Sequence, residues 1–383
     1  MKLNLPEADA FLLVSESAHN ADMYYATGFL AVDSFIYLNS KNDKLLVSDM
    51  ELGRAGKESF IKDVLPTSKF GLMEKLRKHK DVDAAYCEML IEFLRSENIE
   101  RTAVPFNFPV QLADCMRKEG IDVIPIKSPF REMREVKKGP EVAAIEKAQR
   151  AGEIALEEGI NAIKGASIRQ NKFWKDNEPL KTEDVRAIIE MSLLSHGCEA
   201  PDIIIACGPG SSDPHWQGEG ELLADEPIVI DMVPRSKKER YYSDMTRTVM
   251  RGTPSDELKD MYSAVKDSQA AALRKIRAGM MGSDIHNIVC DVMEERGYET
   301  GRGRSGVFTE GFIHSTGHGV GLDIHEGPNL SENGKELKAG TVVTVEPGLY
   351  YKNTGGVRLE DVVVVTQTGC KNLTMFEKNL VLK

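Results

Sequence analysis

Four acidic residues interrupt segments that otherwise have the composition of buried β-strands. They are Asp231 in "IVIDMV", Asp244 in "YYSDMTRTV", Glu346 in "VVTVEPG" and Glu360 in "GVRLEDVVVV". Burying a carboxylate is costly unless a positive charge compensates it. A surface position would explain one such acid, but it is a poor explanation for four in two matched hairpins. Neighbouring antiparallel strands hold side chains of one face about 5 Å apart, so each hairpin can present its two acids together.

If the two hairpins face each other, the four carboxylates converge on one site. Four negative charges cannot share a dry site without cations, so a pair of divalent metal ions is the simplest solution. The stretch "HSTGHGVGLDIHEG" contains His314, His318 and His325, and one of these imidazoles would complete the site. Carboxylates with one histidine form a ligand set that suits Mn²⁺, with Co²⁺, Fe²⁺ and Zn²⁺ as alternatives.

The chain is long enough for two domains. In residues 1–132, strand-like segments at 9–16, 34–39 and 44–50 alternate with helical patterns, which predicts an α/β domain. Residues 133–383 show a helix pair followed by a hairpin, twice over. This order predicts a second domain of the α+β class, built from two similar halves rather than from a doubly wound sheet.

Four helices are expected in the second domain. Three of them are marked by a start or stop signal: Gly139 with Pro140 at the start of a long first helix, Thr182 as the N-cap of the second, and Ser283 and Gly297 bounding the fourth. The third is expected over about 254–278.

Charge and cysteine usage exclude several classes of protein. The formal net charge of −11 argues against nucleic acid and against an anionic membrane as the main partner. No apolar run approaches the length of a membrane span, and the first residues lack the pattern of a signal peptide. The six cysteines form no CxxC pair, so we expect buried thiols in a reducing cytoplasm.

The acids and the histidine occur in an order that resembles a known ligand set. Asp231, Asp244, His318, Glu346 and Glu360 resemble the metal ligands of the methionine aminopeptidase, prolidase and aminopeptidase P family, through "SDMTRT", "HSTGHGVGLDIHE", "TVEPGLY" and "VRLED". The resemblance implies a pita-bread catalytic domain over residues 133–383. More weakly, "NADMYYATGF" resembles the amino-terminal domain of the prolidase and creatinase branch, which favours proline-directed members.

The same resemblance implies roles for individual residues. His318 would bind metal, and the glycines on either side of it would let the backbone pass close to the ions. Glu346 would bind metal and also shuttle a proton to the leaving nitrogen. The remaining residues would contact the substrate or the ligands: His215 in "GPGSSDPHW", His314, His325, Arg358, Thr246 and Tyr350. A rim position for the three histidines and a structural ion pair for Arg358 are the competing interpretations.

One spacing departs from the family pattern. Asp231 and Asp244 are 13 positions apart, which is two more than the family usually has. An even insertion in the turn preserves which face each strand residue occupies, so we expect the ligand geometry to survive. The longer loop affects the rim of the site and therefore the choice of substrate.

The sequence thus predicts a dinuclear metallopeptidase that hydrolyses Xaa-Pro dipeptides, with two Mn²⁺ or Co²⁺ ions per subunit. An aminopeptidase P acting on longer peptides is the nearest alternative. A non-catalytic pita-bread binding protein and a metal-free creatinase-like hydrolase are disfavoured because all five ligand positions are retained. A small peptide is the expected partner, with no nucleic acid or membrane partner, and the resemblance implies a homodimer.

Overall fold

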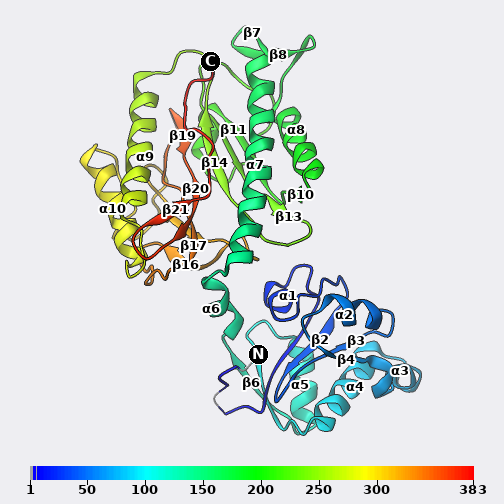
Figure 1. The fold of residues 1–383 in the computed structure, drawn as a ribbon. Coiled ribbons are helices and arrows are strands. Elements are labelled where there is room, and N and C mark those ends of the chain that lie inside the picture. Colours follow the sequence, from blue (N-terminus) through cyan, green and yellow to red (C-terminus); the bar gives the residue numbers. More distant parts are fainter. Residues whose placement is uncertain (1–2, 6) are drawn as a thin grey trace. The chain divides into compact units, whose positions relative to one another are not determined.

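The computed structural model describes residues 3–5 and 7–383, which divide into two compact units, 1–133 and 134–383. Figure 1 shows the elements of each unit. Within the described residues every helix is too short or too polar to cross a bilayer.

Unit 1 is built around a six-stranded sheet in the order β4-β3-β2-β1-β5-β6. The β1–β2 and β2–β3 pairs are antiparallel and the other neighbours are parallel. The strands are β1 (Ala10–Ser15), β2 (Phe35–Asn39), β3 (Asp43–Val47), β4 (Asp63–Pro66), β5 (Arg101–Pro105) and β6 (Asp122–Ile126).

Helices cover both faces of this sheet because both faces of its central strand are apolar. In β1, Leu12 and Val14 face one buried cluster, and Phe11 and Leu13 face another. The helices are α1 (Ala21–Thr27), α2 (Leu52–Glu58), η1 (Thr67–Phe70), α3 (Leu72–His79), α4 (Val82–Ser96), α5 (Val110–Lys118) and α6 (Pro129–Glu135), which runs into unit 2. The expected α/β alternation is confirmed.

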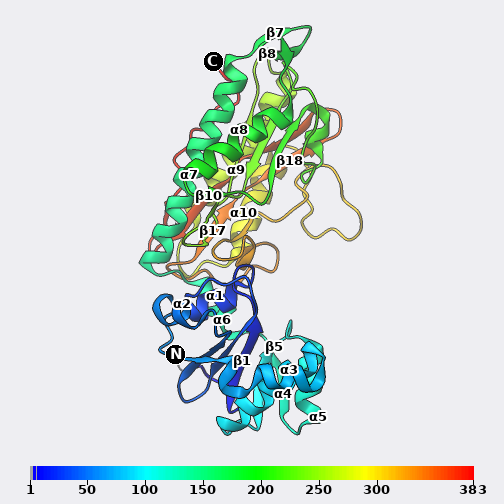
Figure 2. The same ribbon diagram turned by 90° about the vertical axis from the view of Figure 1, so that its right-hand side faces the viewer.

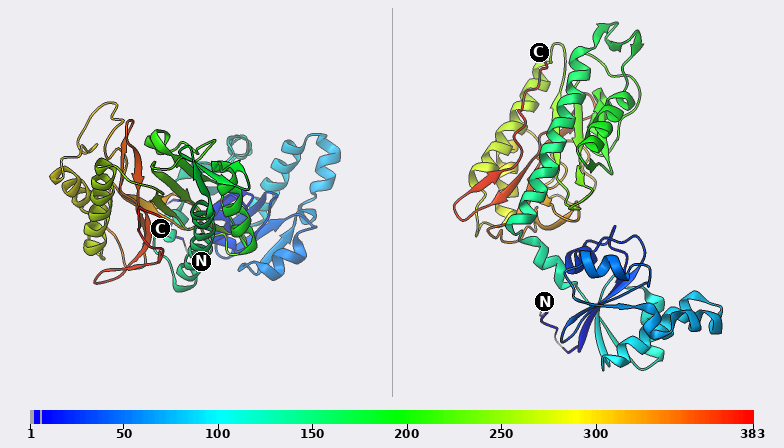
Figure 3. Two further views of the ribbon diagram at one scale, coloured as in Figure 1. Left: turned by 90° about the horizontal axis from the view of Figure 1, so that it is seen from above. Right: turned by 45° about the vertical axis from the view of Figure 1, so that its right-hand side comes forward.

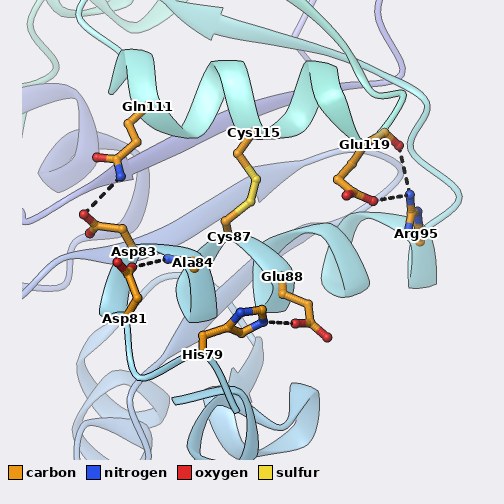
Figure 4. Close-up of a disulfide and its surroundings, with 10 residues drawn as sticks. All are labelled: His79, Asp81, Asp83, Ala84, Cys87, Glu88, Arg95, Gln111, Cys115 and Glu119. Carbon is orange, nitrogen blue, oxygen red and sulfur yellow. Dashed lines mark hydrogen bonds and ion pairs between the residues drawn. A yellow bond between two sulfur atoms is a disulfide. The ribbon is translucent and has the colours of Figure 1, made fainter. Parts of the chain in front are cut away.

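Two cysteines of unit 1 contradict the prediction of free thiols. Cys87 on α4 and Cys115 on α5 form a disulfide, with a Cα–Cα distance of 6.4 Å (Figure 4). A hydrogen bond from Gln111 to Asp83, 3.0 Å long, also joins these two helices. The prediction failed because the pairing depends on helix packing, which a sequence separation of 28 residues does not reveal. The other four cysteines are free, with Cys198 and Cys290 buried.

Unit 2 has the two similar halves that the sequence predicts. In Figure 1, α7 (Gly139–Gly165) and α9 (Asp256–Lys275) lie on opposite sides of the strands. Helix α8 (Thr182–Ser195) lies beside α7 (Figure 2), and α10 (Gly282–Glu295) accompanies α9. Seen from above in Figure 3, left, the strands lie between the two helix pairs. The pita-bread architecture is therefore confirmed.

The starts of α8 and α10 differ from their predicted caps, and α9 is shorter at both ends than the predicted range 254–278. Thr182 is the first residue of α8 rather than its N-cap, and its hydroxyl donates to the carbonyl of Ile205, 3.2 Å away. Helix α10 begins at Gly282, one residue before the predicted cap Ser283. The Thr182 hydroxyl thus bonds to Ile205 instead of capping α8.

The strands of unit 2 form several small sheets. The two that matter for the site are β11-β12-β14 and β16-β15-β17-β20-β21, with a separate β18-β19 hairpin and the small β10-β13 and β7-β8-β9 sheets. The strands are β7 (Ser167–Arg169), β8 (Lys172–Lys175), β9 (Glu178–Pro179), β10 (Cys198–Glu199), β11 (Ile203–Cys207), β12 (Ile228–Met232), β13 (Arg235–Ser236), β14 (Met245–Val249), β15 (Gly317–Gly319), β16 (Glu326–Leu330), β17 (Val342–Val345), β18 (Gly348–Tyr351), β19 (Gly355–Arg358), β20 (Asp361–Val365) and β21 (Cys370–Asn372). A 3₁₀-helix, η2 (Gly208–Ser212), follows β11.

A fully buried arginine joins the two halves of unit 2. Arg247 on β14 donates to the carbonyl oxygens of Thr246 (2.8 Å) and Glu360 (2.6 Å). It also forms an ion pair of 2.9 Å with Asp361, and both side chains are only 1% exposed. Arg247 therefore stabilises the contact between the segment after Asp244 and the segment after Glu360.

Replacing Arg247 with methionine is expected to lower the free energy of unfolding by about 3–5 kcal/mol, since it removes one partner of a buried ion pair. Chemical denaturation measures this loss. The exposed pair Lys371–Glu146, with side chains 58% and 39% exposed, provides the control. Lys371→Met should change the free energy by no more than about 0.5 kcal/mol. Equal effects of the two substitutions would contradict the assigned role.

Candidate metal centre

The first half of unit 2 contributes two of the acids. Asp231 lies within β12, where its register partners are Ile204 of β11 and Thr246 of β14. Asp244 lies directly before β14 and is 4% exposed. Asp231 therefore sits inside a strand as expected, whereas Asp244 sits at a strand end.

The second half contributes the other acids and the histidine. Glu346 follows β17 and Glu360 lies between β19 and β20, so the predicted second hairpin is broken into four strands at these two acids. His318 is the central residue of β15, which pairs with β17. The backbone N–H of Glu360 donates to the carbonyl of Thr246 over 3.1 Å, which brings the acid-bearing segments of the two halves together.

The glycines on either side of His318 leave no room for a side chain. A Cβ atom on Gly317 would lie 2.1 Å from the carbonyl oxygen of Thr344, and one on Gly319 would lie 2.4 Å from that of Gly327. The backbone of β15 therefore lies very close to the backbones of the neighbouring strands β16 and β17. These glycines let β15 pack between its neighbours with His318 held at the site.

Three of the predicted ligands converge most tightly. Ligand atoms of Asp244, His318 and Glu360 all lie within 4.8 Å of one another. The His318 Nε2 atom is 3.6 Å from Asp244 Oδ2 and 3.4 Å from Glu346 Oε1. The Nδ1 atom of His318 lies 3.1 Å from the carbonyl of Gly319, which fits a tautomer with Nδ1–H donating and Nε2 free to bind metal.

The carboxylates are poorly compensated without a cation. Burial raises the pKa of Asp244, and the charges of Asp231 and Glu346 raise it further. Burial and then the charge of Asp244 raise the pKa of Glu360, and burial raises the pKa of Glu346 to about 7. Among the described residues, the buried Oε1 of Glu360 has no hydrogen-bond partner. These features fit a site for divalent metal ions.

Arg358 lies beside Asp231 rather than Glu360. Its guanidinium donates to Asp231 Oδ2 (2.6 Å), to the Tyr350 hydroxyl (2.7 Å) and to Thr246 Oγ1 (3.2 Å). Thr246 in turn donates to Glu360 Oε2 over 2.8 Å. The expected bond from Thr246 to a carboxylate of the site is confirmed, with Glu360 as the acceptor.

His314 belongs to the same hydrogen-bond network as Arg358 and Tyr350. Its Nε2 lies 2.9 Å from the Tyr350 hydroxyl and its Nδ1 lies 2.7 Å from the carbonyl of Ser315. Burial and then the charge of Arg358 lower the pKa of His314 to about 3, so the ring is neutral. The neutral ring donates from Nδ1 and accepts from Tyr350 at Nε2. Direct substrate contact through Nε2 therefore requires Tyr350 to release this nitrogen.

The other two predicted histidines are exposed. His325 packs edge-on against His318 with a ring-centroid distance of 4.3 Å. Partial burial of the His325 ring lowers its pKa. The backbone N–H of His215 donates to Asp213 over 3.0 Å. Both side chains line the site near its opening to solvent.

One cavity of about 450 Å³ has nine of the predicted site residues in its lining, all except Thr246 and Tyr350. Its wall also includes residues that the sequence analysis did not single out, namely Asp202, Ile204, Pro214, Val233, Ser315, Ile324 and Asn329. The alternation of side chains along a strand could have grouped Asp202 with Ile204. The two are two residues apart and so belong to one face of the strand.

Two family models match the chain. The model of metallopeptidase family M24 matches residues 143–367, and that of the creatinase/prolidase N-terminal domain matches residues 3–136.

Named relatives cover nearly the whole chain. An Xaa-Pro dipeptidase of Pyrococcus horikoshii is 30% identical over 370 residues, which are 95% of this chain and 93% of the relative. A crystal structure of an X-Pro aminopeptidase from Thermotoga maritima is 27% identical, with 98% of each chain covered and a TM-score of 0.79. A prolidase from Pyrococcus furiosus is 26% identical, with 97% of each chain covered and a TM-score of 0.77.

Proposed function

The chain belongs to metallopeptidase family M24 and is a peptidase that uses divalent metal, and on this premise we propose that it hydrolyses Xaa-Pro dipeptides. The observation that carries the proposal is the cavity in which four carboxylates and one imidazole meet. The proline preference is supported by the relatives named Xaa-Pro dipeptidase and prolidase, which match the chain almost from end to end.

Five side chains would hold the metal. Asp231, Asp244, His318, Glu346 and Glu360 supply oxygen atoms and one nitrogen, a set that suits two Mn²⁺ or Co²⁺ ions, with Zn²⁺ or Fe²⁺ as alternatives. When bound, such a pair lowers the pKa of a bound water and stabilises negative charge that develops on the peptide carbonyl oxygen.

Glu346 is the proposed proton carrier. Burial raises the pKa of its carboxyl group to about 7 in the metal-free site, and bound cations would lower it, so the proton-carrying role is proposed from its position on the cavity wall. The imino nitrogen of the leaving proline has no hydrogen in the Xaa-Pro bond and must receive a proton to depart. Glu346 lies on the cavity wall beside His318, where it can deliver that proton.

Positively charged and neutral donors would orient the substrate. Arg358, fixed between Asp231 and Tyr350, holds the Asp231 carboxylate in place. The exposed rings of His215 and His325 lie at the opening of the cavity, where they would donate to the peptide carbonyl and the prolyl carboxylate. Tyr350, whose pKa burial raises to about 12, stays protonated and donates to His314 Nε2.

Cleavage of longer peptides is the second candidate function. It is favoured by the match to the X-Pro aminopeptidase structure, which covers 98% of this chain. The two activities differ in whether the cavity accepts residues beyond the proline. A homodimer and a cytoplasmic location stay predictions of the sequence.

A substrate panel tests the proposal. The protein is freed of metal with a chelator, reloaded with Mn²⁺ or Co²⁺, and assayed on Ala-Pro, Ala-Pro-Ala and Met-Ala. We expect no turnover without metal and preferential cleavage of Ala-Pro with it. Faster cleavage of Ala-Pro-Ala would favour the aminopeptidase, and cleavage of Met-Ala alone would refute the proline preference while leaving the metal site intact.

A further inference from the structure

The cavity has one carboxylate on its wall beyond the four proposed ligands. Asp202 lies directly before β11, and its side chain is exposed to solvent. Its Oδ1 accepts a hydrogen bond of 2.8 Å from Gln217 Nε2. Within the described residues, Asp202 has no cationic side chain at ion-pair distance. Its negative charge is therefore available to a ligand.

Strand register places Asp202 relative to the metal centre. Ile204 is the register partner of Asp231, and both line the cavity. Asp202 is two residues earlier and so lies on the same face as Ile204, about 7 Å further along the strand. Continuing the register by one residue places Asp202 opposite Val233, which lines the cavity too.

Three apolar side chains line the cavity together with Asp202, namely Ile204, Val233 and Ile324. A substrate side chain with an aliphatic stem and a cationic end would match this pattern, since the stem contacts the apolar wall and the charge reaches Asp202. The lysine side chain reaches roughly 6 Å from its Cα atom, comparable with the separation along the strand.

Charge also decides which end of a dipeptide faces Asp202. The prolyl residue carries the free carboxylate, which the carboxylate of Asp202 repels. The amino-terminal residue carries the ammonium group and is attracted. The amino-terminal side chain therefore lies on the Asp202 side of the cavity.

We propose that Asp202 determines specificity at this end of the cavity by favouring dipeptides whose amino-terminal residue is lysine or arginine. This inference rests on the proposed Xaa-Pro activity and names the preferred substrates within it. Because Asp202 is exposed, water and salt screen its charge, and the preference is moderate, about three- to five-fold in kcat/KM.

The test compares two side chains of similar length that differ in charge. With the Mn²⁺-loaded protein, kcat/KM is measured for Lys-Pro, norleucyl-Pro and Glu-Pro at low and high salt. We expect Lys-Pro to exceed norleucyl-Pro about three- to five-fold, Glu-Pro to be the poorest, and both differences to shrink at high salt. The Asp202→Asn variant, which keeps an acceptor for Gln217, should bring the Lys-Pro to norleucyl-Pro ratio close to one.

Glu219 provides a matched control, because it is an exposed acid on the neighbouring segment that does not line the cavity. Glu219→Gln should leave the ratio unchanged. The inference is overturned if Asp202→Asn keeps the wild-type ratio, or if it lowers kcat/KM equally for all three substrates, as a contact to the common ammonium group would. If the wild-type protein cleaves no Xaa-Pro dipeptide, the proposed function fails as well, whereas an unaltered ratio with normal cleavage overturns only the role of Asp202.

Discussion

The Glu346→Gln variant, loaded with Mn²⁺, is expected to hydrolyse Ala-Pro with a kcat lower by roughly 10²–10⁴-fold than the wild-type protein. A glutamine side chain has nearly the same shape as glutamate but cannot accept and release a proton. The nucleophilic water would lose its base and the prolyl nitrogen would lose its acid. Steady-state kinetics at saturating substrate measures the loss.

Loss of metal would also lower the rate, so bound metal must be counted in the same samples. A variant that keeps its metal content and loses turnover supports proton transfer by Glu346. Glu239→Gln is the matched control, because Glu239 lies outside the cavity and pairs with Lys147. A Glu346→Gln protein with full metal content and near-normal kcat would refute the proton-transfer role.

The stability of the metal-free protein is expected to fall between about pH 4.5 and pH 7, and bound metal should remove most of this fall. Burial raises the pKa of Glu346 from its ordinary value near 4.5 to about 7 in the folded state. Below pH 4.5 the carboxyl group of Glu346 is protonated in both the folded and the unfolded chain. Its ionisation therefore takes no stability from the folded state in this range. Between the two pKa values only the unfolded chain ionises, which destabilises the folded state.

This shift corresponds to a loss on the order of 3 kcal/mol for Glu346 alone. Asp244 and Glu360, whose pKa values burial also raises, act in the same direction. Unfolding by urea at several pH values measures the effect with and without Mn²⁺. The metal-free Glu346→Gln variant isolates the contribution of Glu346, because its side chain does not titrate. Parallel pH curves for wild type and variant would contradict the assigned pKa.

Local signals in the sequence predicted the elements well where the chain itself determines them. The Gly139–Pro140 pair marks the start of α7, and the unusual acids within apolar strands pointed to residues that line one cavity. These signals work because helix starts and buried charges have strong local rules.

Features that depend on tertiary packing could not be predicted from the sequence. Three features depend on which segments pack together: the partner of Cys87, the acceptor of the Thr182 hydroxyl and the place of Asp202 in the lining of the cavity. Arg247 illustrates the same limit. Within "TRT" it looks like one more strand residue, yet it is completely buried between the two halves of unit 2.

The contact between the two halves of unit 2, which Arg247 joins, has a consequence for the assembly of the metal site. Asp231 and Asp244 come from one half of unit 2, and His318, Glu346 and Glu360 come from the other, so neither half alone contains all five proposed metal ligands. A nascent chain released before Glu360 lacks the last ligand and also the carbonyl that Arg247 binds. The proposed metal site is therefore complete only in a chain that includes Glu360 and has both halves of unit 2 folded together.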